Sequence, residues 1–308
     1  MARLEQISSP VERARCAAIS SLAAFVEAVD PAVDREPEAF WTCAEAFRTL
    51  LGSNFLADVM AWELDCLRRD PDYVPCPRGE RDFEVLHLGR LALSVRVQVP
   101  DAGEPSPLLY GFSEHHITAN MGPGVVGIER WTQPWVGPPE VFDRTKGLVE
   151  APSLLVRPGE QVSFQAHRDV ARTRAMSTAA VLVGLTRVQV TRLRWVYDRG
   201  TLFPVRAEAA DLDASRLDYA MALLSALDHR EAAPVIATLY EHPDHFVRWS
   251  AVRRVIELDP ARGTPLVYRA LTDPHPHIRR AAQRSLERYE ASRSEDITDE
   301  RKTHGPDA

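Results

Sequence analysis

The sequence is poor in several features that would otherwise define its class. No apolar run approaches the roughly 18 residues that a membrane-spanning helix needs, so we expect no transmembrane segment. Lysine is almost absent, since only Lys146 and Lys302 occur, and arginine supplies the remaining positive charge, a bias typical of GC-rich bacteria. The net charge of -7 argues against a general nucleic-acid binder, whose affinity depends on neutralising phosphates.

Cysteine is also scarce. The four cysteines show no C-x-x-C spacing, and no histidine cluster accompanies them: Cys16, Cys43, Cys66 and Cys76. This pattern indicates reduced thiols on helix faces rather than a disulfide framework or a zinc site. A positively charged, secretory-type N-terminus is lacking too, and Ser9-Pro10-Val11-Glu12 instead has the residue order of a helix start. We therefore expect a cytoplasmic protein.

The hydrophobic patterning changes along the chain and predicts an α+β protein with three regions and a tail. Apolar residues recur every three or four positions before residue 75, where Gly52-Ser53-Asn54 separates two helices and Asp70-Pro71 ends the second. Short runs with period two, such as 91–99, then predict an antiparallel β-sandwich or jelly roll with a hairpin turn at Asp198-Arg199-Gly200. The expected domains are 1–78 (helical), 79–210 (β), 211–290 (helical) and 291–308 (disordered tail).

The second helical region contains an internal repeat. HPDHFVRWSAVRRVIEL begins at His242 and DPHPHIRRAAQRSLERY begins at Asp273, an offset of 31 residues. Small residues coincide at the helix contacts, as Ala251 and Ala282 do, which is typical of stacked helix pairs. The Val247-Arg248 and Ile278-Arg279 pairs after a Pro turn resemble HEAT-like repeats over about 80 residues. That resemblance implies an α-solenoid segment that serves as an interaction surface.

The stretch RPGEQVSFQAHRDVAR (157–172) raises the question of a metal site. His167-x-Asp169 resembles the iron-binding pair of 2-oxoglutarate oxygenases, but no histidine follows within the β region to complete that set. The β region resembles cupins in layout, with a Pro-Gly-Glu turn and preceding helices. The cupin metal motifs themselves are not matched: Val170 occupies the ligand position of the second motif, and His115-His116 are adjacent instead of forming His-x-His.

Two interpretations of these histidines remain open. Three imidazoles from His115 or His116, His167 and His87 could converge on iron or another divalent metal, and we take His115, His116 and His167 as the candidate ligands. Alternatively, His167 and Asp169 lie at a strand end and hydrogen-bond locally. Neighbouring residues on a strand face opposite sides, so only one of His115 and His116 can face a barrel interior.

Three further features have a structural and a functional interpretation. A loop with Trp131 and Trp135 either lines a ligand pocket or covers the sandwich edge. Four histidines near the helical turns form either a metal or pH-sensitive cluster, or a set of cap residues repeated because the repeats are related: His242, His245, His275 and His277. Residues 212–290 contain 11 arginines against 11 acidic residues, which argues against a nucleic-acid track, and no nucleotide-binding glycine motif or catalytic nucleophile is evident.

These observations favour a scaffold or regulatory protein that binds a protein partner through its HEAT-like repeats and needs no cofactor. Tryptophan and arginine are common anchors of interfaces, and the candidate contact residues are Arg248, Trp249, Arg253, Arg280 and Arg284. The alternative is a metal-dependent oxygenase or isomerase of the cupin type that uses histidines of the β region for a small-molecule substrate. The sequence does not decide whether the protein is an enzyme.

Overall fold

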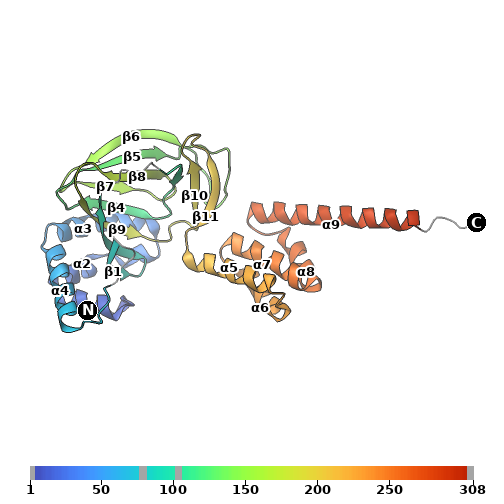
Figure 1. The fold of residues 1–308 in the computed structure, drawn as a ribbon, viewed down its shortest axis with the longest axis horizontal. Helices are drawn as coiled ribbons and strands as arrows, with labels where there is room; N and C mark the ends of the chain where they lie inside the picture. Colours follow the sequence, from blue (N-terminus) through green and yellow to red (C-terminus); the bar gives the residue numbers. More distant parts are fainter. Residues whose placement is uncertain (1–3, 76–81, 101–105, 304–308) are drawn as a thin grey trace, which may run out of the picture. The chain divides into compact units, whose positions relative to one another are not determined.

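The computed structural model describes residues 4–75, 82–100 and 106–303, with side chains as far as Ala291. It divides into two compact units, Met1–Ala210 and Asp211–Ala308, which are described separately (Figure 1). The first unit contains both the N-terminal helices and all the strands. Among the residues described, no helix combines the length and the apolarity needed to cross a bilayer.

The first unit begins with a layer of short helices. Its α-helices and 3-10 helices are η1 (Leu4–Gln6), α1 (Pro10–Ala18), α2 (Ser20–Ala28), η2 (Pro31–Asp34), η3 (Pro37–Thr42), α3 (Cys43–Leu51) and α4 (Phe55–Arg69). The side chain of Ser9 caps α1 by accepting the Glu12 N–H, and the chain leaves α4 at Asp70, as the sequence predicts. Cys16 and Cys66 are free thiols, Cys43 is buried at the start of α3, and Cys76 lies outside the described residues.

Eleven antiparallel strands follow among the described residues. They are β1 (Asp82–Leu88), β2 (Leu91–Gln98), β3 (Leu108–Tyr110), β4 (His115–Asn120), β5 (Val126–Thr132), β6 (Val149–Val156), β7 (Gln161–Phe164), β8 (Asp169–Ala175), β9 (Ala180–Arg187), β10 (Leu193–Asp198) and β11 (Pro204–Ala209). They form a five-stranded sheet in the order β1-β2-β9-β4-β7 and two three-stranded sheets, β6-β5-β8 and β11-β10-β3. The predicted hairpin after Asp198 is confirmed by the β10–β11 pairing.

The five-stranded sheet has a different partner on each face (Figure 1). On one face, alternate residues such as Leu93, Ile117 and Leu185 pack with the N-terminal helices in a single hydrophobic cluster. On the other face, Leu182 and Phe164 pack against residues of β5 and β6. The period-two pattern of each strand therefore separates a helix-facing core from a layer between the sheets.

A buried ion pair fastens the helices to this sheet. Arg15 of α1 pairs with Glu63 of α4 at 2.6 Å, and both side chains are almost fully buried. The Arg15 guanidinium also donates to the carbonyl oxygens of Glu84 and Val85 in β1. One arginine therefore joins two helices and an edge strand.

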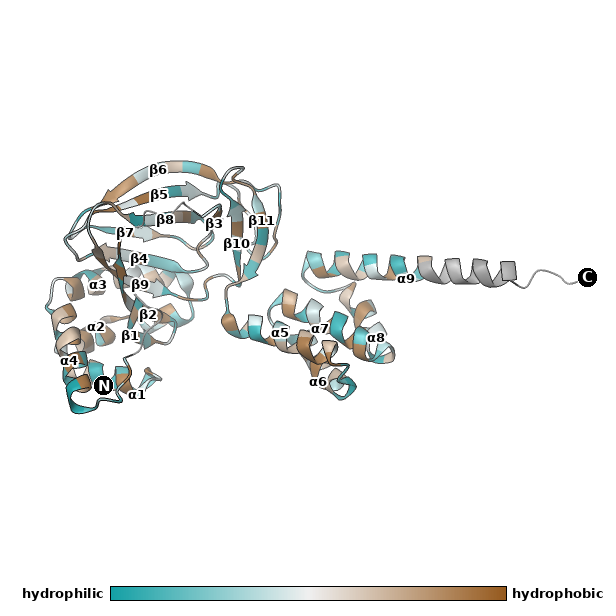
Figure 2. Ribbon diagram, in the orientation of Figure 1, coloured by the Kyte–Doolittle hydropathy of each residue, from teal (hydrophilic) through white to brown (hydrophobic). Residues whose placement is uncertain are grey.

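The second unit consists of packed helices. They are α5 (Leu212–Ala226), η4 (Arg230–Ala232), α6 (Ala233–Thr238), η5 (Leu239–Glu241), α7 (His245–Leu258), α8 (Pro260–Ala270) and α9 (Pro276–Thr303). Apolar residues of α6 and α7, where the ribbon is brown in Figure 2, contribute to one buried cluster. A second cluster joins α7, α8 and α9 through Val252, Val267 and Ala282.

The internal repeat is visible in the backbone contacts of two arginines. Arg248 donates to the carbonyl oxygens of His242 and Pro243, and Arg279 donates to those of Asp273 and Pro274. Each pair of acceptors stands at the same 31-residue offset as the two arginines. The 31-residue repeat in sequence is thus also a repeat of the turn before α7 and α9.

The expected disordered tail from residue 291 differs from the structure, in which α9 continues to Thr303. The segment EASRSEDITDERK lacks apolar periodicity but contains several Glu, Arg and Lys residues, which have high helix propensity.

Candidate functional site

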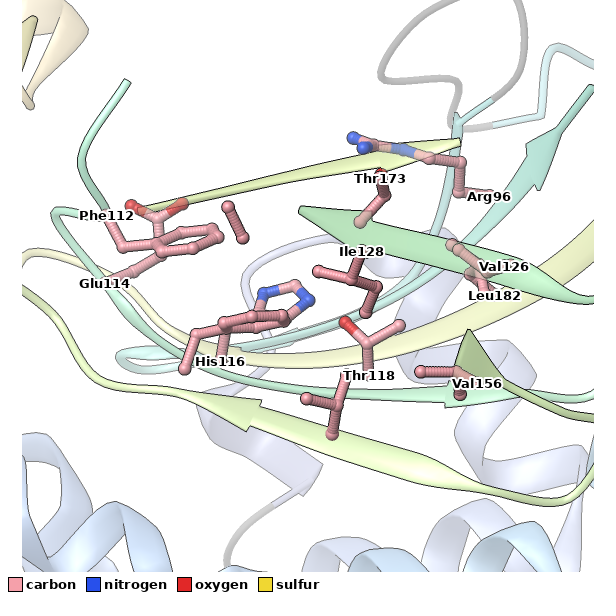
Figure 3. Close-up of a pocket in the computed structure, with 13 residues that line it drawn as sticks. Arg96, Phe112, Glu114, His116, Thr118, Val126, Ile128, Val156, Thr173 and Leu182 are labelled. Atoms are coloured by element: carbon pink, nitrogen blue, oxygen red, sulfur yellow. The ribbon is translucent and has the colours of Figure 1, made fainter. Parts of the chain in front are cut away.

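Strand β4, which lies between β9 and β7, places consecutive side chains in two different layers. Ile117 and Ala119 belong to the core shared with the N-terminal helices. His116 and Thr118 point the other way, into a cavity between the two sheets (Figure 3). The segment 113–120 was not predicted as a strand, because its Gly- and Pro-rich continuation resembles a loop.

The cavity has a volume of about 220 Å³ and mostly apolar walls. Its polar lining comes from five side chains: Arg96, Glu114, His116, Thr118 and Thr173. The apolar lining comes from Phe112, Val126, Ile128, Val156, Val162, Phe164, Ala171 and Leu182. Pockets that bind small molecules have this composition, with a few polar groups on apolar walls.

His116 is the central polar group of the cavity. Its Nδ1 lies 2.9 Å from the Thr186 hydroxyl on the neighbouring strand β9. Its ring also lies over Gly184, where a Cβ atom would stand 3.1 Å from the imidazole Cε1. Burial, assisted by the positive charge of Arg96, lowers the pKa of His116 to about 4. The imidazole is therefore neutral near pH 7 and can donate or accept one hydrogen bond.

Charged groups stand on two sides of this imidazole. Glu114 precedes it on the same side of the chain and accepts a 2.6 Å hydrogen bond from the Ser113 hydroxyl. Arg96 of β2 is paired with Asp82 of β1 and keeps its side chain 56% exposed. The cavity thus presents a carboxylate and a guanidinium to the same space between the sheets (Figure 3).

His115 lies on the opposite face of β4, below the N-terminal helices. Its ring stacks with Phe40 and packs against Trp41, and its Nδ1 accepts the Ala166 N–H. Its Nε2 stands 3.5 Å from a carboxylate oxygen of Glu38. Burial lowers the pKa of His115, with Glu38 acting against that effect. His115 is therefore a core residue of the helix–sheet layer.

His167 occupies a third environment. It adopts a positive φ of 57° after β7, and its ring packs edge-on against Trp135 and Trp195. Burial lowers its pKa to about 4. Asp169 instead accepts the Gln165 N–H and so closes the turn before β8, as the local interpretation expects.

The predicted metal triad of His115, His116 and His167 is therefore wrong. Adjacent residues of β4 face opposite layers, and the turn at 165–169 directs His167 into the tryptophan cluster. His87 is also separate, with its Nε2 3.1 Å from the Gly89 carbonyl oxygen. In the described part of the cavity, Glu114 and His116 are the groups of metal-ligand type, one fewer than an open three-ligand site requires. The donor set does not fit the expected iron or other divalent ion.

Sequence reasoning missed Glu114, Thr118, Thr173 and Arg96 as cavity residues. A usable signal was present in GFSEHHITAN, where Phe112, Glu114, His116 and Thr118 alternate with buried residues. Trp131 and Trp135 do not line the cavity. Trp131 is buried in β5, and Trp135 stacks on Trp195 at 4.6 Å, so both cover the sandwich.

The candidate partner-binding residues of the second unit fall into two groups. Arg248 is 12% exposed and forms a salt bridge with Asp273, so its role there is structural. Trp249 is half-buried and packs against the cluster that joins α7, α8 and α9. Arg253, Arg280 and Arg284 are exposed on α7 and α9 and remain available at the surface.

Comparison with known proteins shows no family profile that matches the chain and no curated protein that matches it in sequence. Similar solved structures include a DMSP lyase (12% identity, TM-score 0.23), covering 34% of this chain and 46% of that one. They include DMSP lyase DddQ from Ruegeria pomeroyi DSS-3 (13% identity, TM-score 0.24). That match covers 37% of this chain and 51% of the lyase chain. They also include a recombinant oxalate oxidase in complex with glycolate (17% identity, TM-score 0.23). That match covers 32% of this chain and 43% of the oxidase chain.

These neighbours are cupin-fold proteins. The matches cover about half the length of the two lyase chains and 43% of the oxidase chain. At TM-scores near 0.24 the likeness carries neither an activity nor a ligand to this chain. The structure itself shows a mixed α+β chain with antiparallel sheets and a cavity between two of them.

Proposed function

We propose that the protein binds a small organic molecule in the cavity between the two sheets. The observation that carries this proposal is the placement of Glu114, His116 and Thr118 on apolar walls that enclose about 220 Å³. That volume is below the roughly 300–1,000 Å³ of drug-sized sites, so the ligand is metabolite-sized. Its apolar part packs against Ile128 and Phe164, and its polar part meets the charged side chains.

The arrangement of Glu114 and His116 suits proton transfer as well as binding. A carboxylate can accept a proton, and a neutral imidazole with a pKa of about 4 can donate a hydrogen bond to the oxygen on which charge develops. This chemistry is that of an isomerase or a lyase. In this form of the enzyme hypothesis, the reaction takes place in the cavity between the sheets. Glu114 and His116 then take the role first assigned to the three histidines.

The test is a screen of small carboxylic acids, hydroxy acids and sugars by thermal shift and ligand-observed NMR. A ligand of this cavity raises the midpoint of unfolding of the wild-type protein and loses affinity in Glu114→Gln and His116→Gln. Glu150→Gln is the matched control, because Glu150 lies exposed on β6. Equal binding to all three variants would place the ligand elsewhere.

A second function is proposed for the helical unit, namely docking of a protein partner on HEAT-like repeats. The repeated turn contacts of Arg248 and Arg279 support it, as do the exposed Arg253, Arg280 and Arg284 on successive repeats. A cross-linking pull-down with wild type and the Arg253→Glu, Arg280→Glu, Arg284→Glu triple variant tests it. Partner capture that survives the triple variant rejects this surface.

We also infer a cytoplasmic location. Its support is the free thiols of Cys16 and Cys66, because paired cysteines are the rule in oxidising compartments. Fractionation of the producing cell, with the protein detected by antibody, tests the inference.

A further inference from the structure

Three histidines meet at the starts of two helices in the second unit. His245 is the first residue of α7, and His275 and His277 flank the first residue of α9. One ring nitrogen from each lies within 4.8 Å of the others. Within the described residues, this is the one group of three or more His, Cys, Asp or Glu side chains close enough to share an ion.

The cluster is not a by-product of the repeat. At the 31-residue offset, His245 corresponds to Pro276, while His275 and His277 correspond to Asp244 and Phe246. No histidine of the cluster therefore stands at the repeat position of another. The interpretation of these residues as copies of one cap residue is therefore wrong for His245, His275 and His277.

The surroundings form a built pocket rather than an open surface. His245 and His277 line a pocket of about 270 Å³ together with Phe246, Trp249 and Asp218. All three histidines are half-buried, so their rings already have restricted freedom. A half-buried group of imidazoles loses less conformational entropy on binding than fully exposed side chains would.

A salt bridge holds the loop that carries His275. The His275 N–H donates to Asp273 Oδ1 at 2.8 Å, and Asp273 is fixed by Arg248 at 2.8 Å. The His277 N–H donates to His275 Nδ1 at 3.3 Å, so His275 can bind an ion through Nε2 only when this bond is released and the ring proton moves to Nδ1. The contact of the His275 backbone with Asp273 is of the kind that orients ligand residues in metal sites.

We propose that His245, His275 and His277 bind one divalent transition-metal ion, for which Zn²⁺ is the natural choice. Three neutral imidazoles are a common ligand set for Zn²⁺ and leave a fourth position open. The ion would join the start of α7 to the start of α9, so that it fastens one helical repeat to the next. The pocket beside it would admit water or an anionic group to the open position.

Binding requires a change in one ring. The imidazoles of His245 and His275 are nearly parallel, with centroids 3.5 Å apart and planes 6° from one another. Parallel stacked rings cannot both direct a nitrogen lone pair at the same ion. One ring must turn about its Cβ–Cγ bond, a torsion with broad, soft preferences.

The experiment is isothermal titration of Zn²⁺ into the tag-free full-length protein after removal of metal with a chelator. We expect one ion per chain, a raised midpoint of thermal unfolding, and visible absorption bands when Co²⁺ replaces Zn²⁺. His245→Gln and His277→Gln should each weaken binding by at least about tenfold, since even outer-sphere changes cost 10–100-fold.

His229→Gln is the matched control, because His229 is an exposed histidine of the same unit and lies outside the cluster. Circular dichroism establishes that each variant is folded before its affinity is compared. Weak, non-stoichiometric binding by the wild type overturns the proposal. So does stoichiometric binding that both cluster variants retain as fully as His229→Gln.

Discussion

Arg248 and Asp273 are joined by two hydrogen bonds, from Nε to Oδ2 at 3.0 Å and from Nη2 to Oδ1 at 2.8 Å. The two residues are 25 positions apart and belong to successive helical repeats. Asp273 is 2% exposed at its side chain, so its charge depends on this partner. The two repeats are therefore held together by an ion pair as well as by apolar contacts.

Removal of the aspartate should therefore destabilise the helical unit. Asp273→Ala leaves a mostly buried guanidinium without its carboxylate, and breaking such a pair costs about 3–5 kcal/mol. Urea denaturation followed by circular dichroism measures the free energy of unfolding. Asp213→Ala is the control, since Asp213 is exposed, and an equal loss in both variants would contradict the role of the pair.

Trp249→Ala should also lower the stability of the helical unit, by about 2 kcal/mol. This figure is below the 3–5 kcal/mol of a fully buried tryptophan because Trp249 is half-buried against the α7–α9 cluster. The sequence instead suggested a surface anchor whose removal leaves folding intact. A thermal midpoint equal to that of wild type would restore the surface interpretation.

Gly184→Val tests the fit of His116 in the cavity. A Cβ atom at Gly184 stands 3.1 Å from one imidazole carbon and 3.3 Å from Nε2, so valine must displace the ring. We expect a loss of about 1–3 kcal/mol, typical of overpacking, together with loss of ligand binding. Valine otherwise favours strands, so unchanged stability and binding would show that the ring has room to move.

Stability should fall as the pH is lowered from about 6.5 towards 4. Burial depresses the pKa of His116 and of His167 to about 4 in the folded state, below the 6.5 of an exposed imidazole. The unfolded chain therefore binds protons first as the pH falls, and this favours unfolding. Denaturation at several pH values measures the slope, which should be shallower in His116→Gln. An unchanged slope in that variant would mean that His116 is not neutral and buried.

Local patterns in the sequence predicted much of the fold. Ser9-Pro10 marked the start of α1, Gly52-Ser53-Asn54 separated α3 from α4, and Asp198-Arg199-Gly200 marked the β10–β11 hairpin. Each of these signals is contained within a few neighbouring residues. The α+β class follows from the same period-two and period-3.6 patterns.

The candidate site was harder to predict because it depends on contacts far apart in the chain. The cavity needs β9 to lie between β2 and β4, and the β6-β5-β8 sheet to pack over them. The order of the strands in a sheet cannot be read from any one strand. The alternation rule did show that His115 and His116 cannot share a cavity. It could not show that His167 turns towards Trp135 and Trp195, because a positive φ at a non-glycine residue has no clear sequence signal.

The two-sided packing of β4 has a practical consequence for protein engineering. A fragment that starts at residue 79 would remove the cover from Leu93, Ile117 and Leu185, which would then face water in the middle of the sheet. Such a fragment would aggregate, however complete its strands are. The cut that preserves a self-sufficient piece lies after Ala210, so that the cavity travels with its helical cover.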